Sequence, residues 1–273
     1  MKPGRPWSRP HGPSPGQPTL RTPPGLDVLE GRNPVLECLR RARRRVVRIH
    51  LDDHARREDK VAEILDLAAR SGAPVESVPR PSLDRASVTG VHNGVIAWAE
   101  PLPDLTFRDL LDQIECQGED PFLVLIDEPQ YEHNLGAVLR SALGGGVHGV
   151  VVPTVRGKGV TAVVQRVAMG AAEAVPVVRE GISSCLATLR RRGVRIVGAD
   201  SDGAPPWSLD LTGPLALVLG GEDKGLTPPL RKRCDALAGI PLAGDLESLN
   251  LSVAAGVLIF EKVRQEAGRR GRV

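Results

Sequence analysis

The sequence predicts an α/β protein: a parallel sheet with helices on both faces, preceded by a smaller α/β unit. Two observations predict it. From residue 120 onwards, continuous Val-, Leu- and Ile-rich runs alternate with helical segments, as in a parallel sheet that is buried on both faces. A polar, Pro-containing stretch over 100–104 then separates this part from the N-terminal unit and predicts a stiff linker.

The N-terminal unit, 27–100, alternates helix and strand. The expected elements are a helix over 33–44, a strand over 46–51, a helix over 58–70, and strands over 75–78 and 94–99. The second helix carries Val61, Ile64, Leu65 and Ala68 at helical spacing on one face. Residues 1–25 are rich in Pro, Gly and Arg and contain no acidic residue, so a disordered basic tail is expected. An organellar transit peptide is the alternative, and the prolines disfavour its amphipathic helix.

The C-terminal unit, 120–273, follows a linker and connecting helix over 101–119. The expected strands are 122–126, 147–152, 174–178, 194–199, 215–219 and 237–240, and the expected helices are 134–143, 160–168, 181–192, 227–233 and 250–266. No apolar run reaches the length of a membrane span, and no signal-peptide core is present.

Composition limits the classes of function. The chain of 273 residues has a net charge of +3 and only seven aromatic residues, so base stacking is not its main way to hold nucleic acid. Its arginines are clustered, with Arg40 to Arg45 the best candidate for meeting phosphates. The four cysteines are far apart and lack metal-ligand spacing, which favours reduced thiols in a cytoplasmic protein and no metal site.

Three polar blocks interrupt the apolar pattern where strands give way to loops or helices. The first is Asn134 to Ala142, which includes Arg140 and follows the strand 122–126. The second, Leu219-Gly220-Gly221-Glu222, follows the strand 215–219. The third is Ser248-Leu249-Asn250-Leu251-Ser252, preceded by Ile240-Pro241-Leu242. A capped helix start would explain one hydroxyl of the third block but not a carboxamide and two hydroxyls together.

Neither common nucleotide-binding motif is present. The Gly144-Gly145-Gly146 cluster precedes its strand, at a helix end, whereas a Rossmann turn follows the first strand. Gly157-Lys158 lacks the remainder of a phosphate-binding loop. A conventional Rossmann-type enzyme is therefore disfavoured.

The three blocks, in this order, resemble the signature of the SpoU (TrmH-type) RNA ribose 2′-O-methyltransferases of the SPOUT superfamily, including the 23S rRNA guanosine type. The resemblance implies S-adenosylmethionine (AdoMet) as cofactor, a trefoil knot, and a homodimer packed through the long C-terminal helix. Gly31 to Glu37 and His92 to Val95 resemble the RNA-binding domain that precedes many catalytic domains of this family.

The resemblance assigns roles to individual residues. Asn134, Arg140, Glu222, Ser248 and Asn250 are the expected catalytic residues, and Leu219, Gly220, Gly221, Ile240, Leu242, Leu249 and Asn250 the expected cofactor-binding ones. Arg140 is expected to anchor a phosphate and stabilise the developing alkoxide, because a guanidinium is a poor base. Asn134 is expected to orient Arg140 or the ribose. A tight turn is the alternative role for Gly220 and Gly221.

RNA contacts are expected from Arg32, Arg41, Arg44 and His92, with a structural corner as the alternative for His92. The sequence departs from the family where Tyr131-Glu132-His133 replaces the usual Asp-Pro; Asp127-Glu128-Pro129 lies further upstream. The expected function is 2′-O-methylation of ribosomal RNA. A transfer RNA substrate, or an RNA-binding ribosome-assembly protein without catalysis, are the alternatives.

Overall fold

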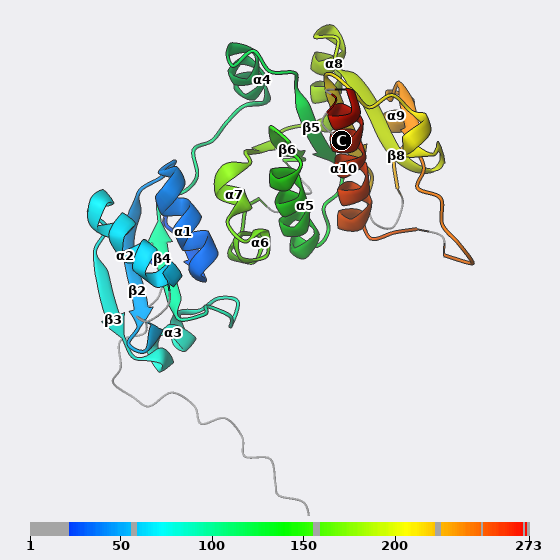
Figure 1. The fold of residues 1–273 in the computed structure, drawn as a ribbon. Coiled ribbons are helices and arrows are strands. Elements are labelled where there is room, and N and C mark those ends of the chain that lie inside the picture. Colours follow the sequence, from blue (N-terminus) through cyan, green and yellow to red (C-terminus); the bar gives the residue numbers. More distant parts are fainter. Residues whose placement is uncertain are drawn as a thin grey trace, which may run out of the picture.

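The computed structural model describes residues 22–55, 59–154, 159–221, 225–246, 248–269 and 271. Most of the predicted N-terminal tail and the expected catalytic Glu222 lie outside these residues. The described chain forms two sheets joined by the segment that carries helix α4 (Phe107–Cys116) (Figure 1). None of its helices is long and apolar enough to cross a membrane.

The N-terminal part is a four-stranded mixed sheet in the order β1-β4-β2-β3. Its elements are β1 (Asp27–Glu30), α1 (Arg32–Arg41), β2 (Val46–Asp52), α2 (Asp59–Ser71), β3 (Val75–Val78), α3 (Arg80–Ala86) and β4 (Val95–Ala99). The expected elements are all present; β1 and α3 were not expected. Helices α1 and α2 cover one face through a core that includes Val35, Leu39, Val61 and Ile64.

The C-terminal part is a six-stranded, all-parallel sheet in the order β10-β8-β9-β5-β6-β7, which confirms the predicted fold class. Its strands are β5 (Phe122–Ile126), β6 (Gly149–Val152), β7 (Val177–Arg179), β8 (Arg195–Ala204), β9 (Leu215–Leu219) and β10 (Ala236–Ala238). Its helices are α5 (Glu132–Gly144), α6 (Ala162–Ala168), α7 (Ala171–Ala174), α8 (Ile182–Arg191), α9 (Pro228–Arg231) and α10 (Leu251–Arg269).

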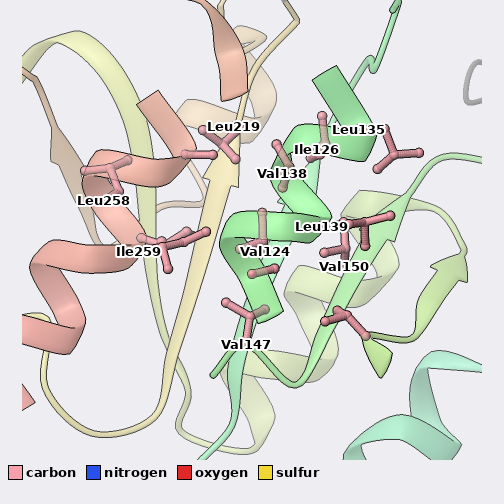
Figure 2. Close-up of a cluster of buried hydrophobic side chains, with 14 of the residues drawn as sticks. Val124, Ile126, Leu135, Val138, Leu139, Val147, Val150, Leu219, Leu258 and Ile259 are labelled. Carbon is pink, nitrogen blue, oxygen red and sulfur yellow. The ribbon is translucent and has the colours of Figure 1, made fainter. Parts of the chain in front are cut away.

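Buried side chains alternate between the two faces of this sheet. Val124 and Ile126 of β5 pack with Val138 of α5 and Leu258 of α10 (Figure 2). Leu123 and Leu125 of the same strand pack on the opposite face with α4 and α8. This alternation explains why the strands read as unbroken apolar runs, since each residue faces one helical layer or the other.

The two parts are in contact through α1, which packs against α6 and α7 (Figure 1). At this contact the guanidinium of Arg44 is bonded to the carboxylate of Glu173, and both side chains are buried. A Cβ at Gly170 would lie 3.1 Å from the carbonyl oxygen of Asn33, so a glycine permits the close approach. The implied trefoil knot stays a prediction.

Candidate active site

A cavity of about 490 Å³ lies at the carboxyl ends of β8, β9 and β10. Parallel strands bring these ends to one edge of the sheet, where α/β proteins commonly bind their ligands. The cavity falls in the size range of about 300–1,000 Å³ that is usual for small-molecule sites. Six of the seven residues predicted to bind the cofactor line it: Leu219, Gly220, Gly221, Ile240, Leu242 and Leu249.

The loop after β9 is folded tightly on itself. Gly221 and Gly225 exchange two backbone hydrogen bonds, of 3.1 and 2.9 Å. A Cβ at Gly220 would lie 2.0 Å from the carbonyl carbon of Gly225, which no side chain can tolerate. Gly220 is therefore required by the path of the loop itself, which agrees with the tight-turn alternative.

Asn250 joins the third polar block to the first. Its side-chain amide Nδ2 donates to Oδ1 of Asn134 at 3.0 Å, across 116 residues of sequence. Its own Oδ1 accepts from the backbone N–H of Ser252 at 2.9 Å and from the Ser252 hydroxyl at 2.6 Å. Asn250 thereby caps α10 and fixes Asn134, which is buried at the start of α5. Ser248 is exposed and lines the cavity.

Arg140 does not line the cavity. It is exposed on α5, six residues after Asn134. Six residues turn an α-helix by about 240°, so the two side chains leave different faces. The expectation that Asn134 orients Arg140 directly therefore does not agree with the helix geometry. Glu222 lies outside the described residues.

The sequence analysis did not predict three charged residues that line the cavity. Asp200 and Asp202, in the second half of β8, each lie 3.2 Å from the guanidinium of Arg231 in α9. All three line the cavity. The signal was present in the sequence, because Asp200 follows directly on a predicted parallel strand whose end must share the edge with Leu219.

The predicted RNA contacts divide into two groups. Arg32 and Arg41 are accessible from solvent, whereas Arg44 is buried beside Glu173 and His92 is 2% exposed. His92 pairs through Nε2 with Asp84 at 2.9 Å and accepts at Nδ1 from the backbone of Gly94. The expectation that Arg44 and His92 contact RNA does not agree with these positions, and His92 fits its alternative as a structural corner.

The described residues hold no cluster of three or more His, Cys, Asp or Glu side chains that could bind a metal ion. All four cysteines are free thiols. Burial raises the pKa of Cys38 and of Cys185 to about 12. Thiolate chemistry at these two positions is thereby suppressed.

Comparisons with known proteins identify the family of the chain. A sequence model of the SpoU rRNA Methylase family matches residues 121–260, and a model described as RNA 2′-O ribose methyltransferase substrate binding matches residues 28–105. The chain is 37% identical to a 23S rRNA (guanosine-2′-O-)-methyltransferase of Pseudomonas putida, covering 90% of this chain and 99% of that protein. It is 40% identical to a protein of Mycolicibacterium smegmatis that is named an uncharacterized tRNA/rRNA methyltransferase, covering 88% of this chain and 76% of that protein.

Among solved structures, the chain resembles the SpoU methyltransferase AviRb from Streptomyces viridochromogenes in complex with AdoMet. The TM-score is 0.72 at 26% sequence identity, and the match covers 89% of this chain and 91% of that one. The similarity therefore extends over both sheets.

Proposed function

Because this chain belongs to the SpoU rRNA methylase family and is an AdoMet-dependent RNA methyltransferase, we propose that it methylates a ribose 2′-hydroxyl. The proposed substrate is a guanosine of 23S-type ribosomal RNA. The observation that carries the proposal is the cavity at the ends of β8, β9 and β10, with the Asn134–Asn250 pair formed by the first and third polar blocks.

The cavity fits the cofactor in size and in lining. Leu219, Ile240 and Leu249 offer apolar walls, and the backbone around Gly220 offers N–H and C=O groups that can recognise an adenine edge. AdoMet supplies an electrophilic methyl group on a sulfonium. We assign Asp200, Asp202 and Arg231 to the polar part of the same cavity, where they can contact the charged or hydroxylated portions of the cofactor.

The remaining requirement is to bind the ribose and to stabilise the charge that develops as its hydroxyl loses a proton. Asn134 and Asn250 hold each other in place and present carboxamides beside the start of α10. Arg140 keeps its positive charge at any ordinary pH, so we assign it to the adjacent phosphate and the developing alkoxide.

We assign RNA recognition to the N-terminal part, residues 27–100. We expect the reaction to take place in the cytoplasm, where ribosomal RNA is found. Transfer RNA is the second candidate substrate, since the M. smegmatis relative is named a tRNA/rRNA methyltransferase.

We also propose a homodimer through α10. Val253, Val257 and Phe260 are 50%, 40% and 49% exposed and recur at helical spacing, and Leu143 at the end of α5 is 40% exposed. Such a stripe is suited to association with a second copy. Sedimentation velocity should give a dimer for the wild type and a monomer for Val257→Glu; a monomeric wild type would contradict the proposal.

The test of the reaction is transfer of tritiated methyl groups from AdoMet to transcripts of 23S rRNA, 16S rRNA and tRNA, followed by digestion to nucleosides. The expected product is 2′-O-methylguanosine from 23S rRNA. Label in tRNA only would favour the second candidate, and label in a base would contradict ribose methylation. RNA binding without any transfer would favour the assembly protein.

A further inference from the structure

A second cavity, of about 150 Å³, lies where the N-terminal part meets α6. We call it the junction pocket. Its walls come from the turn between β1 and α1, from Lys60 of α2, from Asn93 before β4, and from Arg166 and Met169 at α6. The pocket is far too small for AdoMet, and its residues are separate from those of the cavity at the ends of β8, β9 and β10.

Cationic and amide groups from four segments converge on this pocket. Arg32, Lys60 and Arg166 line it together with Asn33 and Asn93. The Arg32 Nε donates to the carbonyl oxygen of Asn93 at 3.1 Å, and the Lys60 Nζ donates to Oδ1 of Asn33 at 2.8 Å. These bonds hold both long side chains beside the pocket. The start of α1 also lies here, and its N-cap residue, Gly31, has no side chain that could cap the helix.

Two further features set the junction pocket apart from an ordinary basic surface. The Nε of Arg166 is buried, and no protein group in the described part of the chain accepts its proton. Asn93 and Met169, two of the three non-glycine residues with positive φ among those described, both line the pocket. Unusual backbone conformations tend to gather at ligand sites.

Glu30 also lines the pocket, and its carboxylate oxygens are occupied by residues outside it. These oxygens accept from the Ser87 and Thr89 hydroxyls and from the backbone N–H groups of Val88 and Thr89. The pocket therefore presents mainly donors. Guanidinium, ammonium and amide donors beside the first turn of a helix are the groups that bind phosphate in proteins.

We propose that the junction pocket binds one backbone phosphate of the RNA substrate, with Arg166 and Lys60 as its main ligands. The inference rests on the proposed function for the presence of RNA. Lys60 belongs to the N-terminal part and Arg166 to α6, which packs against α5, the helix of Asn134 and Arg140. A phosphate held by both parts fixes the RNA relative to the active site, whereas a phosphate on the N-terminal surface alone would not.

The test uses full-length Lys60→Gln and Arg166→Gln, with Arg70→Gln as the control. Arg70 lies at the other end of α2, is exposed, and pairs with Asp66. Filter binding of a labelled 23S rRNA transcript is measured between 50 and 200 mM salt. Each pocket variant should weaken binding about fivefold and reduce the salt slope by about 0.7–1, the contribution of one phosphate contact. The control should match the wild type, and AdoMet affinity and melting temperature should be unchanged in all three.

A competition experiment distinguishes a pocket that binds the RNA backbone from one that binds free phosphate. Inorganic phosphate and AMP are titrated against the wild type and Arg166→Gln. If Arg166→Gln loses phosphate binding but retains the RNA affinity of the wild type, the proposal is overturned. Wild-type RNA affinity and salt slope in both pocket variants would also overturn it, even if the protein methylates RNA. If the wild type binds RNA but transfers no methyl group, the proposed function fails. The salt slopes of the variants still show whether the junction pocket binds a phosphate of the RNA.

Discussion

Asn250 connects the stability of α10 to the geometry of the site, so its two roles can be separated by substitution. Asn250→Ala removes the oxygen that accepts from Ser252 and should destabilise the protein by about 1 kcal/mol, the usual value of an N-cap. Asn250→Asp keeps that oxygen and should be nearly as stable as the wild type. Both should lower methyl transfer, because both lose the amide that donates to Asn134. Urea unfolding and transfer assays on the two variants measure this, and equal destabilisation would contradict the cap.

His50 is expected to make stability depend on pH. Burial lowers its pKa below 6.5, Arg48 acts in the same direction, and Glu76 opposes them. The unfolded chain therefore takes up the proton first as the pH falls, so stability is complete above about 6.5 and declines below it. Urea unfolding from pH 7.5 to 5.5 should show a smaller decline for His50→Gln than for the wild type. Identical pH profiles would show that His50 plays no part.

Seven of the seventeen residues that line the cavity were predicted from the sequence, because the polar blocks that carry them resemble those of a known family. The sequence could not place Arg140 relative to Asn134 in the assembled site, and it did not select Asp200 and Arg231, which meet only after the strands assemble. Arg44 was misassigned for a similar reason. An arginine within a basic run looks solvated, and its carboxylate partner, Glu173, lies 129 residues away.

Strands were predicted best where turn or polar residues bound a short run on both sides. β3, β5 and β9 have the predicted bounds. In the N-terminal unit, the sequence prediction missed β1 and α3. In the C-terminal unit, the strand expected over 174–178 begins only at Val177, because the four-residue α7 precedes it. A single turn of helix and an edge strand such as β1 bury too few residues to give a periodic signal.

The close approach of β8 to β10 and Gly239 gives a prediction for these elements. A Cβ at Gly203 would lie 2.6 Å from the backbone of Gly239. Gly203→Ala should therefore destabilise the protein by about 1–3 kcal/mol and weaken AdoMet binding, because the clash is with backbone at the edge of the cavity. Gly268→Ala, which meets nothing within 4 Å, is the control and should be neutral or slightly stabilising. Calorimetry measures both effects, and a neutral Gly203→Ala would contradict this close approach.

The contact between the two parts of the molecule includes a buried ion pair. The side chains of Arg44 and Glu173 are 1% and 0% exposed. Glu173→Ala leaves the Arg44 guanidinium buried with Asp27 as its remaining carboxylate partner, so it should cost about 3 kcal/mol. The neighbouring Arg45–Glu100 pair is 71% and 44% exposed, and Arg45→Ala should cost less than about 1 kcal/mol. Chemical denaturation compares them; equal costs would show that the buried pair does not hold the two parts together.

The sequence predicted the order of the two units, because the proline-containing linker interrupts their patterns. It could not predict that they pack through α1, α6 and α7, since contacts between separate units leave no periodic signal. The knot and the dimer also remain predictions, both taken from the family resemblance.

The central claim is that the protein transfers a methyl group from AdoMet to a ribose hydroxyl with help from the charge of Arg140. Single-turnover transfer of tritiated methyl groups to 23S rRNA tests it most directly, with alkaline hydrolysis to locate the label, since 2′-O-methylation protects the adjacent phosphodiester. The wild type should place label in alkali-resistant dinucleotides. Arg140→Ala should be about 10²–10³-fold slower while binding RNA and AdoMet within about tenfold. Wild-type-like turnover in Arg140→Ala, or label only in alkali-labile mononucleotides, would contradict the account.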